Sequence, residues 1–384
     1  MTTLTVGQGK EYSTISAAVA ASHNGDVIAV DAGTYTNDYA TITTNITIEG
    51  VGGMVNLVST GDIPNGKAIL VTDANVTLDH LSFSGATVAD GNGAGVRYET
   101  GNLTITNCYF HDNQDGLLAA ANPTGTISID HSEFAHNGTG DGYTHGLYVG
   151  EIADLTVTNS YFHDTVVGNQ IKSRADNTVI ENNRIIDGTN GTASYDIDLP
   201  DGGKALISGN VIQQSATSQN PAIIHFGGEG GPYAGSSLTI ENNTILNDLA
   251  GGTALLNQTS ITATMDHNQL YNVTHVASGP VSESADTILT TEPAIDTSHP
   301  WQAATTSTTT TTPTSTTSTT PTSTTTTTTT TGTSSSSPTT TTSPTTAPST
   351  TTTSTTPSTT GSGTTTVTDQ GHHYQHTWHW HWFG

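Results

Sequence analysis

One phrase recurs eight times between Leu78 and Leu270, and its spacing limits the folds that this chain can adopt. It consists of an apolar, polar, apolar triplet, a short polar turn and one large apolar residue, as in LTITNCYF at 103–110. A unit of this size cannot bury its apolar side alone, so neighbouring units must stack to enclose a core. Successive closing residues are separated by 27, 24, 28, 23, 27, 33 and 25 positions, at Phe83, Phe110, Phe134, Phe162, Ile185, Ile212, Ile245 and Leu270.

Each repeat contains one predicted β-strand with a buried and a solvent-facing side. The residue five positions before the closing one is apolar in all eight repeats, and the residue after it is polar. This alternation is typical of a strand, because successive side chains point to opposite faces. Coils stacked one strand spacing apart, about 4.8 Å, form a right-handed parallel β-helix, an all-β solenoid. A β-propeller or a sandwich of short strands is the alternative, although propeller blades are expected to span roughly 40 to 45 residues.

The turn of the repeat has a pattern of its own. The last four repeats carry asparagine two positions before the closing residue, at Asn183, Asn210, Asn243 and Asn268. This pattern predicts a left-handed turn and a ladder of side-chain amides that hydrogen-bond from coil to coil. The single cysteine, Cys108, takes this position in an earlier repeat, and we interpret it as a small buried side chain rather than a nucleophile. Histidines recur at another turn position, where hydrogen bonding is favoured over metal binding: His80, His131 and His267.

The N-terminal residues extend the same picture. Residues 14–21, TISAAVAA, place Ile15, Ala18 and Val19 on one helical stripe, and a short helix there would cover the open end of a solenoid. Together with GDVIAVDAGTY at 25–35 and the coils that follow, residues 2 to about 290 resemble the pectate-lyase-like superfamily and its right-handed β-helix region proteins. The resemblance implies the fold but no single reaction, because the superfamily includes lyases, hydrolases, epimerases and non-enzymatic adhesins.

Composition divides the chain into three parts. Residues 1–300 carry the repeats and form the predicted β-helix domain. Residues 301–366 are almost wholly Thr, Ser and Pro, so they cannot offset the entropy of ordering by burial and are predicted to form an extended or disordered linker. Residues 367–384 form a His- and Trp-rich tail, for which we favour a docking or export role.

The charge of the chain argues against one class of binding partner. The formal net charge is −26 with only seven Lys and Arg residues, which argues against a nucleic-acid partner because phosphate binding needs clustered cations. No segment approaches the roughly 20 apolar residues of a membrane span. Residues 1–4 lack the parts of a cleavable secretion signal, yet the Thr/Pro linker, the acidic balance and the solenoid favour an extracellular or cell-surface location.

Four of the seven cationic residues lie within one short stretch, at Lys172, Arg174, Arg184 and Lys204. Strand alternation predicts that Gln170, Lys172 and Arg174 face outward, as do Asp196 and Asp198 in the next coil, with Tyr195 facing inward. Spacings of 24, 26 and 27 residues then predict that four side chains form a single outward column: Tyr148, Lys172, Asp198 and His225. Arg174 and Asp196 are predicted to lie beside this column.

Such a column is suited to an acidic polysaccharide. Uronate carboxylates need cations to neutralise them, and sugar faces stack on aromatic rings such as Tyr148. Arg174 is expected to disfavour the charged form of Lys172, which makes Lys172 the predicted base for removal of the C5 proton. A calcium ion is predicted to make that proton more acidic. The predicted ligands of this ion are Asp196, Asp198 and Asp201. The alternative is that Lys172 and Arg174 simply pair with the aspartates of the next coil, as a ladder of ion pairs on a solvent-exposed face.

A shorter segment resembles one group within the superfamily. Residues 171–173, IKS, followed by NTVIENN at 177–183, are similar to the Lys-Ser segment of the chondroitinase B and alginate lyase group. That similarity implies that Lys172 is a catalytic base. The sequence VGNQ at 167–170 replaces the acidic calcium ligands that precede the lysine in that group.

We therefore predict an exported protein that acts on an acidic, uronate-containing polysaccharide by β-elimination or C5 epimerisation, with Lys172, Arg174, Asp196, Asp198 and His225 as catalytic residues. A glycine-rich loop after His225 is predicted to wall the site. The predicted substrate contacts are Tyr148, Gln170, Lys204, Glu229 and Tyr233. Two alternatives remain: a non-catalytic surface or adhesin-type rod on a Thr-rich stalk, and a glycoside hydrolase that uses Asp196 and Asp198.

Overall fold

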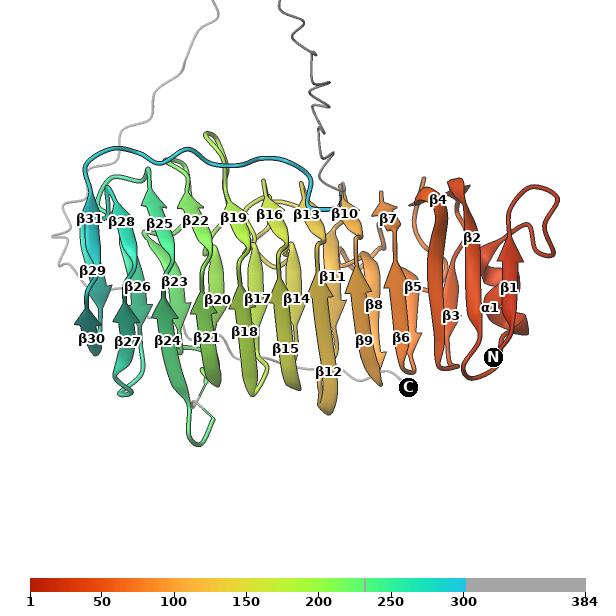
Figure 1. Ribbon diagram of the computed structural model, residues 1–384, viewed down its shortest axis with the longest axis horizontal. Helices are drawn as coiled ribbons and strands as arrows, with labels where there is room; N and C mark the ends of the chain where they lie inside the picture. Colours follow the sequence, from red (N-terminus) through yellow and green to blue (C-terminus); the bar gives the residue numbers. More distant parts are fainter. Residues whose placement is uncertain (231–232, 302–384) are drawn as a thin grey trace, which may run out of the picture. The chain divides into compact units, whose positions relative to one another are not determined.

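The computed structural model describes residues 1–230 and 233–301, and these form a right-handed parallel β-solenoid with one short helix (Figure 1). The predicted all-β fold is confirmed. The linker at 301–366 and the tail at 367–384 lie outside the described residues, apart from Trp301. No helix in the described part of the chain is long and apolar enough to cross a membrane.

Three parallel faces run along the solenoid, and every pairing between strands is parallel. The first face pairs strands in chain order: β1 (Thr3–Val6), β2 (Val27–Thr36), β4 (Ile46–Val58), β6 (Val76–Asp79), β9 (Asn102–Thr106), β12 (Asn122–Asp130), β15 (Ile152–Thr158), β18 (Asn177–Glu181), β21 (Lys204–Ser208), β24 (Ser237–Glu241), β27 (Ala263–Asp266) and β30 (Val281–Ser284).

The long strands β2 and β4 bend onto the second face, which continues through β7 (Leu81–Ser84), β10 (Tyr109–His111), β13 (Glu133–Ala135), β16 (Tyr161–His163), β19 (Arg184–Ile186), β22 (Val211–Gln214), β25 (Thr244–Asn247), β28 (Gln269–Tyr271) and β31 (Thr287–Leu289). The third face is a separate 10-stranded sheet: β3 (Ala40–Ile42), β5 (Ala68–Asp73), β8 (Ala94–Thr100), β11 (Asp115–Ala119), β14 (Leu147–Val149), β17 (Ile171–Ser173), β20 (Ile197–Leu199), β23 (Ala222–Phe226), β26 (Thr253–Asn257) and β29 (His275–Ser278).

The core is built from columns of like residues, one from each coil. The closing residues of the repeat pair with one another across β7, β10, β13 and β16, and their rings stack with centroids 4.5 to 5.0 Å apart: Phe83, Phe110, Phe134 and Phe162. All four rings are fully buried. The loose period of the sequence is absorbed in the loops, so the strands keep register.

The predicted amide ladder is present. The Asn210 side-chain oxygen accepts the backbone N–H of Asn183 at 2.8 Å and its Nδ2 at 3.1 Å, and Asn243 and Asn268 repeat this pattern. The left-handed backbone belongs one residue earlier, with φ of +57° at Asn182 and +58° at Asn242, so the predicted position of the turn residue was off by one. Cys108 sits in the same column, fully buried, and burial raises the pKa of its thiol to about 12.

The histidines at the turn position act as predicted. Nδ1 of His80 and of His131 lies 2.7 Å from the preceding aspartate, and the backbone of both residues is left-handed. At the N-terminal end, helix α1 (Ile15–Ala21) begins after Thr14, whose hydroxyl accepts the Ala17 N–H at 3.2 Å. The apolar stripe of this helix is buried against the first coil, so the expected cap of the solenoid is confirmed.

After β31, residues 290–301 run back along the second face, and we call them the C-terminal strap (Figure 1). Arg184 on β19 donates to the carbonyl oxygen of Asp296 at 2.9 Å. Further along, the buried carboxylate of Glu133 on β13 meets His299 Nδ1 at 2.7 Å and accepts from Trp301 Nε1 at 2.9 Å. The strap thus ends on the middle of the solenoid.

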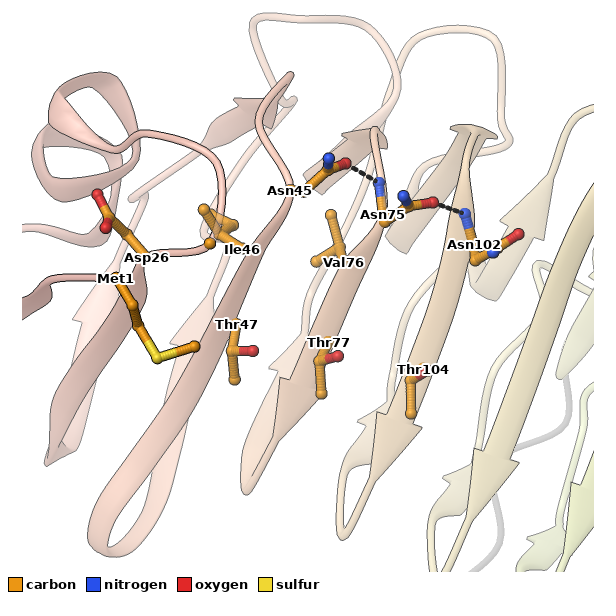
Figure 2. A pocket seen from close by; sticks show the side chains of 11 residues that line it. Met1, Asp26, Asn45, Ile46, Thr47, Asn75, Val76, Thr77, Asn102 and Thr104 are labelled. Atoms are coloured by element: carbon orange, nitrogen blue, oxygen red, sulfur yellow. Dashed lines mark hydrogen bonds between the residues drawn. The ribbon is translucent and has the colours of Figure 1, made fainter.

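A shallow pocket of about 250 Å³ lies beside the N-terminal coils. Figure 2 shows that an asparagine ladder lines it, in which Asn45 accepts the backbone N–H of Asn75 at 2.9 Å and Asn75 accepts that of Asn102 at 2.8 Å. Its one side-chain carboxylate, Asp26, is bound by the backbone N–H groups of Thr2 and His23. These groups stabilise turns, and we place the candidate chemistry elsewhere.

Candidate functional site

The predicted outward column exists, and the strand register defines it. Tyr148 on β14 pairs with Lys172 on β17, Lys172 with Asp198 on β20, and Asp198 with His225 on β23. The alternate residues Ile171, Ile197 and Ile224 are buried on the inner side of the same strands. We call Tyr148, Lys172, Asp198 and His225 the Lys172 column.

Asp198 is the centre of this column. Its Oδ2 lies 3.0 Å from Lys172 Nζ and accepts from Asn169 Nδ2 at 2.8 Å, while its Oδ1 lies 2.7 Å from His225 Nδ1. The residue is 1% exposed. Burial raises the pKa of the Asp198 carboxyl, but the bonds and charges of His225 and Lys172 outweigh burial and lower it, so Asp198 is a buried carboxylate held by cations.

The contacts of His225 favour its imidazolium form. Its Nδ1 faces Asp198, and its Nε2 faces Oε1 of Gln258 at 2.8 Å, so the ring satisfies both oxygens when both nitrogens carry protons. Burial lowers the pKa of His225, but Asp198 and Gln258 raise it by more. The ring also stacks on Tyr195, with centroids 4.6 Å apart and planes 16° apart.

Lys172 is held as an ammonium, contrary to the expectation that Arg174 would disfavour its charge. Burial lowers the pKa of Lys172, but the carboxylates of Asp198 and Glu229 raise it above its usual value. The distances from Nζ are 3.0 Å to Asp198 and 2.8 Å to Glu229. Two carboxylates within contact distance therefore decide the charge of Lys172, while Arg174 binds Asp201 and shares Glu229 with Lys172.

Arg174 anchors the loop to the column. Its NH1 donates to both oxygens of Asp201 at 2.9 Å, its NH2 donates to Glu229, and its Nε donates to the Tyr148 hydroxyl at 3.1 Å. The Tyr233 hydroxyl donates to the Arg174 carbonyl at 2.9 Å. The loop residues Glu229 and Tyr233, predicted to wall the site, do reach it.

Two residues predicted to face outward are buried on the inner side instead. Asp196 is 2% exposed, and no described residue hydrogen-bonds either of its carboxylate oxygens; burial and Asp187 raise its pKa well above the usual value. Gln170 is fully buried and accepts from the Thr165 hydroxyl at 2.7 Å. Both residues stand immediately before a strand, where the chain turns the corner, so the alternation within the strand does not extend to them.

Two further positions differ from the prediction. Lys204 begins β21 on the first face and is exposed, so it is not among the side chains gathered around Lys172 on the third face. Tyr195, predicted to face inward, stacks on His225 outside the core. It too lies in the corner before β20.

The three aspartates predicted to hold calcium do not fit that ion. Asp196 faces the interior, Asp198 binds Lys172 and His225, and Asp201 binds Arg174. Among residues 1–230 and 233–301, no group of three or more His, Cys, Asp or Glu side chains is placed to hold a metal. The same geometry contradicts the alternative of a hydrolase with an Asp196 and Asp198 pair, because the two carboxylates do not share a face.

Sequence reasoning missed two residues that shape the site. Asn169 bridges two coils: its Nδ2 donates to Asp198, and its Oδ1 accepts the backbone N–H of Tyr195 at 3.1 Å. Nδ1 of His145 accepts the Asn169 N–H at 3.0 Å, and its ring stacks on Tyr148. Burial and the charge of Lys172 lower the pKa of His145 to about 3, so this ring is neutral. Both residues precede strands, outside the repeating pattern.

Comparisons with known proteins agree with the fold. A family model described as the right-handed β-helix region matches residues 28–215 and 120–290, while curated proteins give no match. Among solved structures, pectate lyase Pel9A aligns with 15% identity and a TM-score of 0.53, covering 74% of this chain and 78% of its own. The surface protein and adhesin PfbA of Streptococcus pneumoniae aligns with 11% identity and a TM-score of 0.43, covering 71% and 91%.

Proposed function

The chain belongs to the right-handed β-helix family, and on that premise we propose that its Lys172 column binds a uronate-containing polysaccharide and acts on it by β-elimination or C5 epimerisation. The observation that carries the proposal is the convergence of Lys172, Arg174 and His225 on one outer face of a chain with only seven Lys and Arg residues. Together they gather three cationic side chains at one place in a protein whose net charge repels polyanions.

The binding role follows from chemistry that matches sugar acids. The planar guanidinium of Arg174 suits the two oxygens of a carboxylate, and Lys172 adds a second cation beside it. The ring of Tyr148, half-buried beside Arg174, offers an apolar face for a sugar ring. The named activity of one structural neighbour, a pectate lyase, is compatible with such a ligand, although that likeness concerns the fold. We place this activity outside the cell or at its surface, where such polymers occur.

The proposed reaction needs a base and charge neutralisation. In β-elimination, the base takes the C5 proton, a C4–C5 double bond forms, the C4–O4 bond breaks and the departing O4 takes a proton. In epimerisation, C5 regains a proton on its opposite face instead. We assign the base to Lys172 and the neutralisation of the substrate carboxylate to Arg174. Because Asp198 and Glu229 keep Lys172 protonated in the free protein, Lys172 acts as the base only after it has released a proton to water.

The test is to incubate the protein with a panel of uronate polymers and follow the ultraviolet absorbance of unsaturated ends. Incorporation of solvent deuterium at C5 tests the epimerase version. Lys172→Met is expected to abolish either signal. Lys10→Met serves as the matched control, because the substitution removes the same charge far from the column. Lys10 pairs with Asp31 at 3.2 Å in the N-terminal coils.

If no polymer gives unsaturated ends or C5 exchange, the reaction is contradicted. Binding without turnover would then favour the non-catalytic, adhesin-type alternative. Activity that Lys172→Met leaves intact would contradict the assignment of the base while preserving the polysaccharide activity.

A further inference from the structure

Glu229 occupies a distinctive position in the site. Its carboxylate bridges the two cations assigned to substrate binding, with Oε1 2.8 Å from Lys172 Nζ and Oε2 in contact with NH2 of Arg174. It comes from the loop after β23, more than 50 residues away in sequence, whereas the other carboxylates come from the neighbouring coil. A carboxylate between Lys172 and Arg174 is also what a bound uronate would present.

The three carboxylates of the site differ in how firmly they are held. The side chain of Asp198 is 2% exposed and that of Asp201 is 16% exposed, while that of Glu229 is 39% exposed. Asp198 has three partners, while Asp201 and Glu229 each accept two bonds among the described residues, so the exposed fraction is what distinguishes Glu229 from Asp201. Glu229 is therefore the most replaceable of the three.

The backbone that carries Glu229 is fixed, so its side chain can leave without a loop rearrangement. The Gly227 N–H donates to the Leu199 carbonyl at 2.9 Å, and the Glu229 N–H donates to that of Pro200 at 3.2 Å. Gly228, with φ of +103°, packs so closely that an added Cβ would lie 2.0 Å from Oε1 of Gln258. Rotation about the side-chain bonds of Glu229 would carry its carboxylate toward solvent.

We propose that Glu229 is a built-in occupant of the carboxylate-binding position, which a uronate carboxylate displaces when substrate binds. This inference rests on the proposed function and adds a regulatory element to the same site. It predicts that the free protein is self-blocked and that removing the charge of Glu229 strengthens uronate binding.

The charges of the site support an exchange of one carboxylate for another. Lys172, Arg174 and His225 contribute three positive charges, and Asp198, Asp201 and Glu229 contribute three negative charges, which gives zero when Glu229 is in place. When Glu229 leaves, one positive charge faces the ligand. The uronate carboxylate then takes the position of Glu229 between Lys172 and Arg174, so the exchange keeps two carboxylates beside Lys172 and restores the balance of charge.

The experiment compares wild type with Glu229→Gln, which keeps the shape of the side chain, and with Glu283→Gln, an exposed control on β30. Binding of galacturonate and of short uronate oligomers is measured by calorimetry. Glu229→Gln is expected to bind each ligand at least about tenfold more tightly than wild type, while Glu283→Gln matches wild type. Equal or weaker binding by Glu229→Gln overturns the proposal.

A second measurement follows the Lys172 side chain by NMR in the same three proteins. Its pKa is expected to be lower in Glu229→Gln than in wild type, and an unchanged pKa contradicts the exchange. The two proposals fail differently. If no polymer reacts but galacturonate binds more tightly to Glu229→Gln, the displacement stands and the reaction falls. If polymers react but Glu229→Gln shows no gain in binding, the displacement falls and the reaction stands.

Discussion

His225 Nδ1 lies 2.7 Å from Asp198 Oδ1, across two adjacent coils of the third face. The two residues are 27 positions apart in sequence, yet the register sets them side by side. Because Asp198 also binds Lys172, this one carboxylate raises the pKa of two of the three cations in the site.

The first prediction concerns pH. The pKa of His225 is raised above its unfolded value of about 6.5, so its stabilising contribution is fully present below pH of about 6.5 and is lost as pH rises through the folded pKa. NMR titration of His225 should show a pKa above 6.5, and Asp198→Asn should lower it. A wild-type pKa at or below 6.5 would contradict the bond to Asp198.

The second prediction concerns the stability of the column. Replacing Asp198 by Asn removes a buried carboxylate and leaves Lys172 and His225 without their shared partner. Breaking a buried ion pair at one partner costs about 3 kcal/mol or more in the free energy of unfolding, which urea denaturation measures. Asp90→Asn, an exposed substitution in a loop, should change it by less than about 0.5 kcal/mol. Equal effects of the two substitutions would show that Asp198 is not a structural centre.

The third prediction concerns the amide ladder. Asn210→Ala removes the oxygen that accepts two bonds from Asn183 and the Nδ2 that donates to the Ile180 carbonyl at 2.8 Å. Buried groups left without partners cost about 1–3 kcal/mol each, so the free energy of unfolding should fall by at least that amount. Asn190→Ala, at an exposed loop position, is the matched control. An Asn210→Ala protein as stable as this control would contradict the role of the ladder.

The fourth prediction concerns the C-terminal strap. Burial raises the pKa of Glu133, but His163 and His299 lower it by more. The stabilisation that the ionised Glu133 contributes to the folded protein is therefore present above the unfolded pKa of about 4.3 and is lost as pH falls through the folded pKa. Glu133→Ala removes the partners of His299 and Trp301. Fluorescence of Trp301, measured in a chain truncated after residue 301, should then shift to longer wavelength at neutral pH. An unshifted spectrum would show that the strap is held by other contacts.

Much of the fold follows from the sequence because the repeat is local and regular. A strict alternation over four or five residues sets which side chains face the core, and the spacing sets which coils align, so Tyr148, Lys172, Asp198 and His225 were placed in one column. The family model matches the same region of the chain.

The errors fall where the chain leaves the strands. Gln170 and Asp196 occupy corners, where two consecutive residues can face the same side, and alternation gave the wrong side for both. The charge of Lys172 was wrongly predicted for a different reason. Sequence proximity pointed to Arg174 as its neighbour, while the carboxylates that decide its pKa come from the next coil and from a loop.

The account depends most on the claim that the cations of the Lys172 column recognise a uronate carboxylate. The direct measurement is the affinity of a uronate oligomer for wild type, Arg174→Met and Lys10→Met at one ionic strength, determined by calorimetry. We predict that Arg174→Met weakens binding by at least about tenfold while Lys10→Met leaves it unchanged. Equal affinities for all three proteins, or no binding to any of them, would contradict the claim.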